Sequence, residues 1–271
     1  MANQDQRGWL RVGWCFFGRH NETEPTCYTP YCVYVGARKN SLTQKQKLLG
    51  QKLEVLAHDV AQCRACPRLV QWREDVAREK RASFREDVYW GRGVAGFGDP
   101  CAQLLVLGLA PAAHGANRTG RVFTGDRSGD WLYRAMYRAG FANQPTSVHA
   151  GDGLELTNAW VTAAVKCAPP GNAPTPAERA TCKPFFEREV AALEDAHVLV
   201  CLGAFAYQAA TELLGIRPRA KFGHGVEMQH GKWTVLCSFH PSQQNTFTGK
   251  LTEPMFDAVF SRARELCAKP A

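Results

Sequence analysis

The segment 108–126 gathers side chains of several chemical types in one polar, glycine-rich stretch. It reads GLAPAAHGANRTGRVFTGD and contains an imidazole at His114, an aromatic ring at Phe123 and a carboxylate at Asp126. Such groups can hydrogen-bond to, stack on or activate a bound molecule. The segment lacks GxGxxG, GKS/T and GxSxG patterns, which excludes dinucleotide, P-loop and serine-hydrolase sites at the level of motif.

Two further polar segments carry groups of the same kind. CAPPGNAPTP contains Asn172, and HPSQQNTFTGK contains His240. Each of these residues also has a purely structural interpretation: Asn172 as a turn residue, His240 as a hydrogen-bonded histidine at a strand end, and Asp126 as the cap of a helix that starts near Ser128.

Apolar runs and amphipathic runs alternate along the chain and would position these segments. The apolar runs that predict strands lie at about 103–109, 157–166, 197–203 and 233–239. The amphipathic patterns that predict helices lie at about 51–63, 128–140, 176–195, 204–215 and 252–267. This alternation predicts an α/β fold, a single domain with a central, mostly parallel four-stranded sheet flanked by helices.

The three polar segments each follow one of the expected strands. In open α/β sheets, ligands bind beyond the carboxyl ends of the strands. We therefore expect segments 108–126, 167–176 and 240–250 to converge on one cleft.

The first part of the chain differs from the rest. Residues 1–50 carry scattered Trp, Tyr, Cys and Gly without a helical or strand period, and we expect a poorly structured N-terminal extension there. Residues 51–271 are expected to form the α/β domain. With 45% apolar residues, the chain can bury a full core.

The chain has 33 basic and 25 acidic residues, a formal net charge of +8. A basic balance suits a polyanionic partner such as nucleic acid, although by itself it is weak evidence. No apolar run is long enough to cross a membrane, and the N-terminus has no continuous apolar core typical of a signal peptide. A cytoplasmic, monomeric protein is expected.

The cysteine count of 11 is high and odd for a chain of this kind. It argues against a disulfide framework and for metal ligands. Cys63 and Cys66 form a CxxC, and Cys167 and Cys182 follow far along the chain. Four thiolates in this arrangement can hold zinc or an iron–sulfur cluster; the open second half favours a 4Fe–4S cluster. Alternatively, the CxxC is a redox pair and the other two thiols are buried in the core.

These motifs together resemble those of the iron–sulfur uracil-DNA glycosylases, and most closely family 5, the type-B enzymes. The resemblance is carried by CRACPRLVQWRE, GLAPAAHGANRTGRVFTGD, VKCAPPGNAPTPAE with Cys182 beyond it, and HPSQQNTFTGKLT, between about residues 60 and 255. It implies a uracil-DNA glycosylase-like fold and a monofunctional glycosylase of base excision repair. Such an enzyme flips uracil or another damaged base out of double-stranded DNA and hydrolyses its N-glycosidic bond.

The resemblance also implies roles for particular residues. Asp126, Asn172 and His240 match catalytic positions, and Phe123 is the expected stacking platform for the flipped base. The expected base-binding residues are Gly108, Ala110, Pro111, His114, Phe123, Asn172 and His240. The expected DNA contacts are Arg118, Arg121, Ser242, Gln243, Gln244, Asn245 and Lys250. The expected ligands of a structural 4Fe–4S cluster are Cys63, Cys66, Cys167 and Cys182.

One position departs from the wider superfamily. Other branches carry Asp, Asn or Glu in the first motif, where this chain has Ala110, Ala112 and Ala113. The small side chains leave space for bulkier lesions, but they also remove the usual water-activating residue. A non-catalytic, cluster- or metal-bearing DNA-binding protein is therefore the alternative, and a redox iron–sulfur protein is a third class. Asp126, Asn172 and His240 together favour the enzyme.

Overall fold

The computed structural model describes residues 43–268. The chain divides into two units, Met1–Pro30 and Tyr31–Ala271, and every described residue belongs to the second. Of the extension expected over residues 1–50, residues 1–42 lie outside the described part of the chain. Helix α1 (Gln44–Gln62) begins before the boundary expected at residue 51, because Thr43 and Gln46 form a capping box at its start.

Strands and helices alternate along the described chain, as the apolar runs predicted. The strands are β1 (Phe97–Gly98), β2 (Leu104–Gly108), β3 (Ala159–Ala163), β4 (Val198–Leu202), β5 (Glu227–His230) and β6 (Trp233–Ser238). After α1, the α-helices are α2 (Pro67–Glu79), α3 (Ala116–Thr119), α4 (Arg127–Arg138), α5 (Pro176–Ala192), α6 (Ala204–Leu213), α7 (Gln243–Phe247) and α8 (Glu253–Cys267). Short 3₁₀ turns occupy Ala82–Phe84 and Pro170–Asn172.

Within residues 43–268 the sheet has six strands in the order β1-β3-β2-β4-β6-β5, rather than the four expected. The four predicted strands form its parallel centre. The two additional strands are antiparallel and lie at the edges. The sequence did not indicate them because β1 is only two residues long and β5 reads EMQH, which is largely exposed and carries no apolar run.

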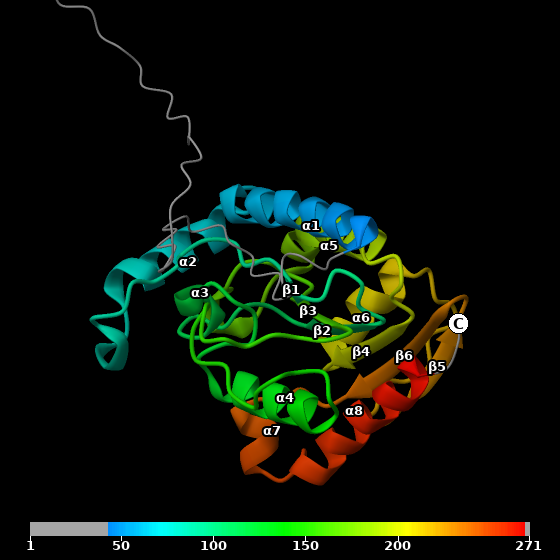
Figure 1. The fold of residues 1–271 in the computed structure, drawn as a ribbon. Helices are drawn as coiled ribbons and strands as arrows, with labels where there is room; N and C mark the ends of the chain where they lie inside the picture. The colour runs from blue at the N-terminus through cyan, green and yellow to red at the C-terminus, as the bar shows by residue number, and fades with distance from the viewer. Residues whose placement is uncertain (1–42, 269–271) are drawn as a thin grey trace, which may run out of the picture. The chain divides into compact units, whose positions relative to one another are not determined.

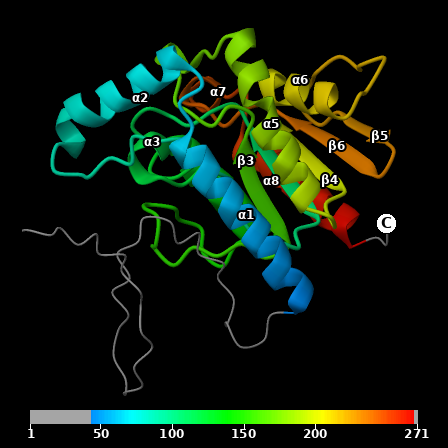
Figure 2. The same cartoon turned by 90° about the horizontal axis from the view of Figure 1, so that it is seen from above.

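Helices cover both faces of the sheet (Figure 1). One face packs on α4 and α8, with Leu132 and Phe260 in its core, and the other packs on α1, α5 and α6. Figure 2 shows α1 and α5 side by side over the sheet. Because both faces are covered, all residues of β2 are buried, which explains why the strand reads as a continuous apolar run.

The central strands end together and so define one edge for a site. Gly108 at the end of β2 is paired with Ala163 at the end of β3, and Leu202 of β4 with Ser238 of β6. β2 has β3 on one side and β4 on the other, the arrangement that opens a crevice outside the carboxyl ends. None of the helices within residues 43–268 is both long and apolar enough to cross a membrane.

Candidate active site

The loops that follow β2, β3 and β6 lie at this carboxyl edge, as predicted. Helix α3 belongs to the first loop and α7 to the third, and both lie at the same end of the sheet (Figure 1). The segment that precedes β1 joins them, since Trp90 N donates to the carbonyl of Arg118 and Gly91 N to that of Asn117. The edge is therefore built from four stretches of chain.

Phe123 packs directly on the end of β2. A Cβ atom on Gly108 would lie 2.5 Å from the tip of its ring, so the absence of a side chain at Gly108 permits the contact. The centroids of the Phe123 and His240 rings are 5.9 Å apart, with an interplanar angle of 32°. Phe123 has a φ of 50°, a left-handed conformation that is costly for an aromatic residue. The first and third loops thus bring two planar groups together.

Asp126 caps helix α4, as its position before Ser128 allowed. Its Oδ1 accepts a hydrogen bond of 3.0 Å from Gly129 N. Its Oδ2 lies against Gly115, where a Cβ atom would be only 2.0 Å away. Burial raises the pKa of Asp126, and hydrogen bonds from Gly129 and Ser128 offset this only in part. Among the described residues, no basic side chain lies within ion-pair distance of it.

His240 lies between the end of β6 and α7 and is held through its backbone. Asn245 Nδ2 donates a 2.9 Å hydrogen bond to the His240 carbonyl, so Asn245, expected at the DNA, also fixes the histidine. Burial lowers the pKa of His240 to about 4, and the imidazole is neutral at physiological pH. Within residues 43–268 its ring nitrogens have no hydrogen-bond partner. The ring is available to a ligand as a neutral donor.

Asn172 ends the 3₁₀ turn after β3, at the same edge of the sheet. It is exposed, with a φ of 56°, which fits the turn interpretation. Its side chain makes no hydrogen bond to any other described residue. The structure brings Phe123 and His240 into contact, whereas Asn172 lies in a separate loop and its side chain is hydrogen-bonded to neither of them in the described part of the chain.

His114 has a partner that the sequence did not indicate. Its Nδ1 lies 3.0 Å from the hydroxyl of Tyr89, which is itself buried. Burial lowers the pKa of His114, and the charges of Arg81 and Arg118 lower it further. A tyrosine 25 residues upstream gives no periodic or spacing signal, so only the folded chain reveals the pair.

The predicted DNA contacts fall into two groups. Arg118 donates to Asp87 and to the carbonyls of His114 and Gly125, and Arg121 is 6% exposed and paired with Asp152. Both arginines hold the loop together, and neither can reach a phosphate without breaking these bonds. The exposed side chains lie on or beside α7, whose N-cap is Ser242: they are Gln243, Gln244 and Lys250.

Helix α7 also carries an exposed aromatic ring that sequence reasoning missed. Phe247 is 68% exposed, and the Arg127 guanidinium lies 4.3 Å from its ring centroid. A phenylalanine within an otherwise polar loop was the available signal.

Comparison with known proteins identifies the family. Residues 95–264 match the model of the uracil DNA glycosylase superfamily. The chain belongs to this superfamily. It is 55% identical to a type-5 uracil-DNA glycosylase of Mycobacterium bovis over 212 residues. The aligned residues cover 76% of this chain and 79% of the relative. A type-5 uracil-DNA glycosylase of Thermus thermophilus is 47% identical over 215 residues, 79% of this chain and 97% of the relative.

The superfamily match over residues 95–264 includes Cys167 and Cys182, two of the four expected cluster ligands. The fold brings the other two, Cys63 and Cys66, near them. Cys66 packs on the cluster of buried side chains formed by Leu69, Val165, Cys167 and Cys182. Burial, together with the nearby Cys167 and Cys63 thiols, raises the pKa of Cys182 to about 12. The four cysteines therefore lie in one neighbourhood. Within residues 43–268, however, no three metal-ligating side chains are close enough to hold a metal ion.

The surroundings of these thiols fit an anionic sulfur centre. Arg73 is buried. Its Nη1 donates a hydrogen bond of 2.9 Å to Cys167 Sγ, and its Nη2 donates one to the Cys63 carbonyl. Lys166 N donates to Cys182 Sγ at 3.2 Å. Among the described residues Arg73 has no carboxylate within ion-pair distance, and its Nε has no hydrogen-bond partner. A buried guanidinium needs a counter-charge, and thiolates would supply it.

Proposed function

We propose that this chain is a uracil-DNA glycosylase of base excision repair. It takes uracil out of double-stranded DNA, hydrolyses the bond between the base and the sugar, and leaves an abasic site. The observation that carries this proposal is the contact of Phe123 with neutral His240 at the carboxyl edge of the sheet, in a loop that also carries Asp126, a carboxyl group with no basic side chain within ion-pair distance among the described residues. The names of the relatives, all glycosylases, support it.

The mechanism follows from the charges that form as the bond breaks. When the C1′–N1 bond cleaves, its electrons go to the base and positive charge develops on the sugar. Phe123 stacks on the flipped base, and His240 donates a hydrogen bond to a base oxygen as negative charge grows there. His240 is neutral, so one of its ring nitrogens carries the hydrogen that it donates to the base oxygen.

Asp126 is assigned to the sugar side of the reaction. As a carboxylate without a basic partner, it stabilises positive charge on the sugar and orients the water whose oxygen bonds to C1′. Its N-cap hydrogen bond to Gly129 fixes its orientation without neutralising it. The amide of Asn172 contacts the base or the water from the second loop.

The floor of the base pocket is assigned to small residues. Gly108, Ala110 and Pro111 place little side-chain volume beside Phe123, and His114 supplies a hydrogen-bonding group. Other deaminated or damaged bases are accepted for this reason. Ser242, Gln243, Gln244, Asn245 and Lys250 contact the DNA strand, whereas the geometry favours a loop-ordering role for Arg118 and Arg121.

The deciding experiment is alkaline cleavage of a labelled duplex with one uracil, beside a hypoxanthine duplex and an undamaged duplex. We expect cleavage of the two damaged duplexes alone. Binding without any abasic product would instead establish the alternative, a non-catalytic DNA-binding protein, which the comparisons do not support.

Cys63, Cys66, Cys167 and Cys182 are assigned as ligands of a structural 4Fe–4S cluster. When bound, the cluster supplies a cross-link between the start of α2 and the segment around α5, not a reacting group. Protein purified without oxygen is expected to absorb at about 400 nm and to contain iron. Cys182→Ser should lose both signals, and Cys201→Ser, in the core of β4, should keep them. Zinc without iron would contradict the assignment.

The remaining proposals concern the whole molecule. The chain from helix α1 onward constitutes the catalytic domain, the residues before α1 are an extension, and the protein is a cytoplasmic monomer. Light scattering tests the oligomeric state. A chain beginning at Ser41, which retains the α1 cap, tests whether the domain folds and cleaves alone.

A further inference from the structure

Tyr89 is a buried tyrosine that none of the roles assigned above uses, and it lies against His114 in the loop that follows β2. Its hydroxyl oxygen is 3.0 Å from His114 Nδ1. The two rings meet edge to face, with centroids 6.1 Å apart and an interplanar angle of 84°. The contact therefore fixes both the position and the plane of the imidazole.

The direction of this hydrogen bond follows from the surroundings of the hydroxyl group. Arg81 N donates to the Tyr89 oxygen at 3.5 Å, so the oxygen already accepts a hydrogen bond. Among the described residues, His114 Nδ1 is the one acceptor within reach of the hydroxyl hydrogen. A buried hydroxyl group normally donates its hydrogen. Tyr89 therefore donates to Nδ1, and Nδ1 carries no hydrogen.

A neutral imidazole with a bare Nδ1 carries its hydrogen on Nε2. Burial, together with the charges of Arg81 and Arg118, lowers the pKa of His114 below its ordinary value of 6.5, so the ring is neutral near pH 7. Nε2 points away from Tyr89, because the two ring nitrogens point in nearly opposite directions, and it has no hydrogen-bond partner within residues 43–268. His114 thus presents one N–H donor whose direction is set by Tyr89.

The segment that carries Tyr89 is itself tied to the loop. Arg118 donates to Asp87 and, at 2.8 Å, to the His114 carbonyl. The Arg118 guanidinium carbon lies 3.9 Å from the centroid of the Phe84 ring. The backbone of His114 and the segment before Tyr89 are therefore held by the same arginine.

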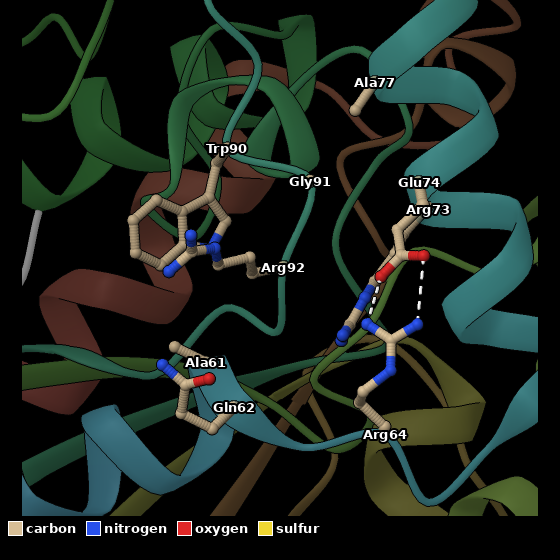
Figure 3. A pocket seen from close by; sticks show the side chains of 9 residues that line it. All are labelled: Ala61, Gln62, Arg64, Arg73, Glu74, Ala77, Trp90, Gly91 and Arg92. Atoms are coloured by element: carbon tan, nitrogen blue, oxygen red, sulfur yellow. Dashed lines mark hydrogen bonds and ion pairs between the residues drawn. The ribbon is translucent and has the colours of Figure 1, made fainter.

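The segment after Tyr89 packs on helix α2. Figure 3 shows Trp90 and Gly91 facing α2 across the cavity that they line. The approach at Gly91 is close, since a Cβ atom there would lie 2.9 Å from the Cβ of Ala77. Because the chain is held on both sides of it, Tyr89 is a fixed support for the imidazole.

The donor belongs to the part of the loop beside Asp126. Gly115 follows His114 directly, and a Cβ atom on Gly115 would lie 2.0 Å from Asp126 Oδ2. A nucleotide whose sugar meets Asp126 therefore brings its base to the same loop. Flipped bases are recognised by hydrogen bonds to their Watson–Crick edge.

A fixed N–H donor distinguishes carbonyl groups from amino groups. Cytosine carries an amino group, a donor, where uracil carries a carbonyl oxygen, an acceptor. Opposite the amino group, the His114 donor would be left unpaired. An imidazole free to move its hydrogen to Nδ1 would instead accept from that amino group. The tautomer that Tyr89 selects therefore favours uracil over cytosine.

We propose that Tyr89 is a positioning residue for base recognition, which holds His114 as an Nε2–H donor to the carbonyl oxygen that distinguishes uracil from cytosine. The inference rests on the proposed function for the identity of the ligand. The position of the hydrogen on the His114 ring does not depend on that function.

Nuclear magnetic resonance of the whole protein, labelled with ¹⁵N in its histidines, tests the tautomer. The His114 signals are those that disappear in His114→Gln. We expect a bare Nδ1 and a hydrogen-bearing Nε2 in the wild type. A hydrogen on Nδ1 would overturn the inference, because His114 would then donate to Tyr89 and offer Nε2 as an acceptor.

Two matched duplexes test the ligand. Each carries one 2′-fluoro nucleotide opposite an abasic position, with uracil as the base in one duplex and cytosine in the other. The fluorine slows cleavage because it destabilises positive charge on the sugar, and neither base is paired. The His114 Nε2 signal should shift with the uracil duplex and shift much less with the cytosine duplex. Equal shifts would place the donor elsewhere on the DNA and overturn the assignment.

Excision of uracil in single turnovers tests the positioning role. Tyr89→Phe should lower the rate about tenfold and His114→Ala about 10²-fold. Because Tyr89 acts through His114, Tyr89→Phe should cause no further loss in the His114→Ala background. The control Tyr137→Phe, at an exposed tyrosine of α4, should leave the rate unchanged. An unchanged rate in Tyr89→Phe, or an equal loss in both backgrounds, would overturn the role.

The failure of this inference differs from the failure of the proposed function. If the wild type excised no uracil, the proposed function would be wrong. The tautomer of His114 and its response to the two duplexes would still decide whether Tyr89 fixes a donor for the base.

Discussion

Asp126 and Asp152 are two acidic side chains of the same region with opposite electrostatics. Burial would raise the pKa of both. At Asp152, hydrogen bonds from Val148 N and the paired Arg121 outweigh burial, and its pKa is lowered. At Asp126, two backbone hydrogen bonds are too weak to do so, and its pKa is raised. The fold therefore pairs Asp152, which orders the loop, with a basic side chain. Asp126, to which we assign a catalytic role, has no such partner among the described residues.

Neutralisation of Asp126 is expected to have the largest effect on excision. Asparagine caps helices as well as aspartate, so Asp126→Asn should fold with little change in melting temperature. Loss of the charge should lower single-turnover excision of uracil by on the order of 10²–10³-fold. Excision within about tenfold of the wild type would assign Asp126 to capping alone.

The pH dependence of excision gives a second measure of the same residue. Because the pKa of Asp126 is raised, its carboxylate takes up a proton at a higher pH than an ordinary aspartate as the solution is acidified. The wild-type rate should therefore fall on acidification, with an inflection above 3.8. This inflection should be missing from the residual activity of Asp126→Asn.

His240 extends the comparison to a base that burial keeps neutral. We expect His240→Ala to lower excision by about 10²-fold, and the matched variant His230→Ala, on the exposed edge strand β5, to have no effect.

The pKa of His240, about 4, lies below the ordinary histidine value of 6.5, so the folded state resists protonation of this ring. The stabilising contribution is complete above pH 6.5 and is lost as the pH falls toward 4. Urea unfolding from pH 7 to pH 4.5 measures it, and His240→Ala should show a smaller loss.

Neutralising Asp152 should affect stability rather than chemistry. Asp152→Asn leaves the buried Arg121 without its counter-charge, although Ser147 and Thr124 still accept from it. The free energy of unfolding should fall by about 2 kcal/mol. At a temperature where the variant is folded, excision should remain close to the wild-type rate. A loss as large as that of Asp126→Asn would show that the two carboxylates are not functionally distinct.

The smallest effect is expected at an exposed ion pair. Glu253 accepts from Arg134 and Arg138, and its side chain is 38% exposed. Solvent screens these pairs, so Glu253→Gln should change the free energy of unfolding by no more than about 1 kcal/mol. Thermal unfolding at low and high salt checks this, and the difference should shrink as salt rises.

Much of the site could be predicted because its loops follow strands. Since the four central strands are buried on both faces, their apolar runs are continuous, and the polar segments after them must meet at one edge. The contact of Phe123 with His240 agrees with that prediction. The hydrogen bond from Gly129 to Asp126 confirms the capping interpretation of Asp126. The strand β5 could not be predicted, since an exposed edge strand needs no apolar pattern.

The alternation of elements, the order of the motifs and the types of groups at the edge could be predicted, because they depend on local pattern. Which charges are paired could not be predicted and depends on the folded chain. Arg121 reaches Asp152 across 31 residues, and Tyr89 reaches His114 across 25. Pairing over such separations depends on how the loops fold back, and burial then decides whether each charge is compensated or left available for chemistry.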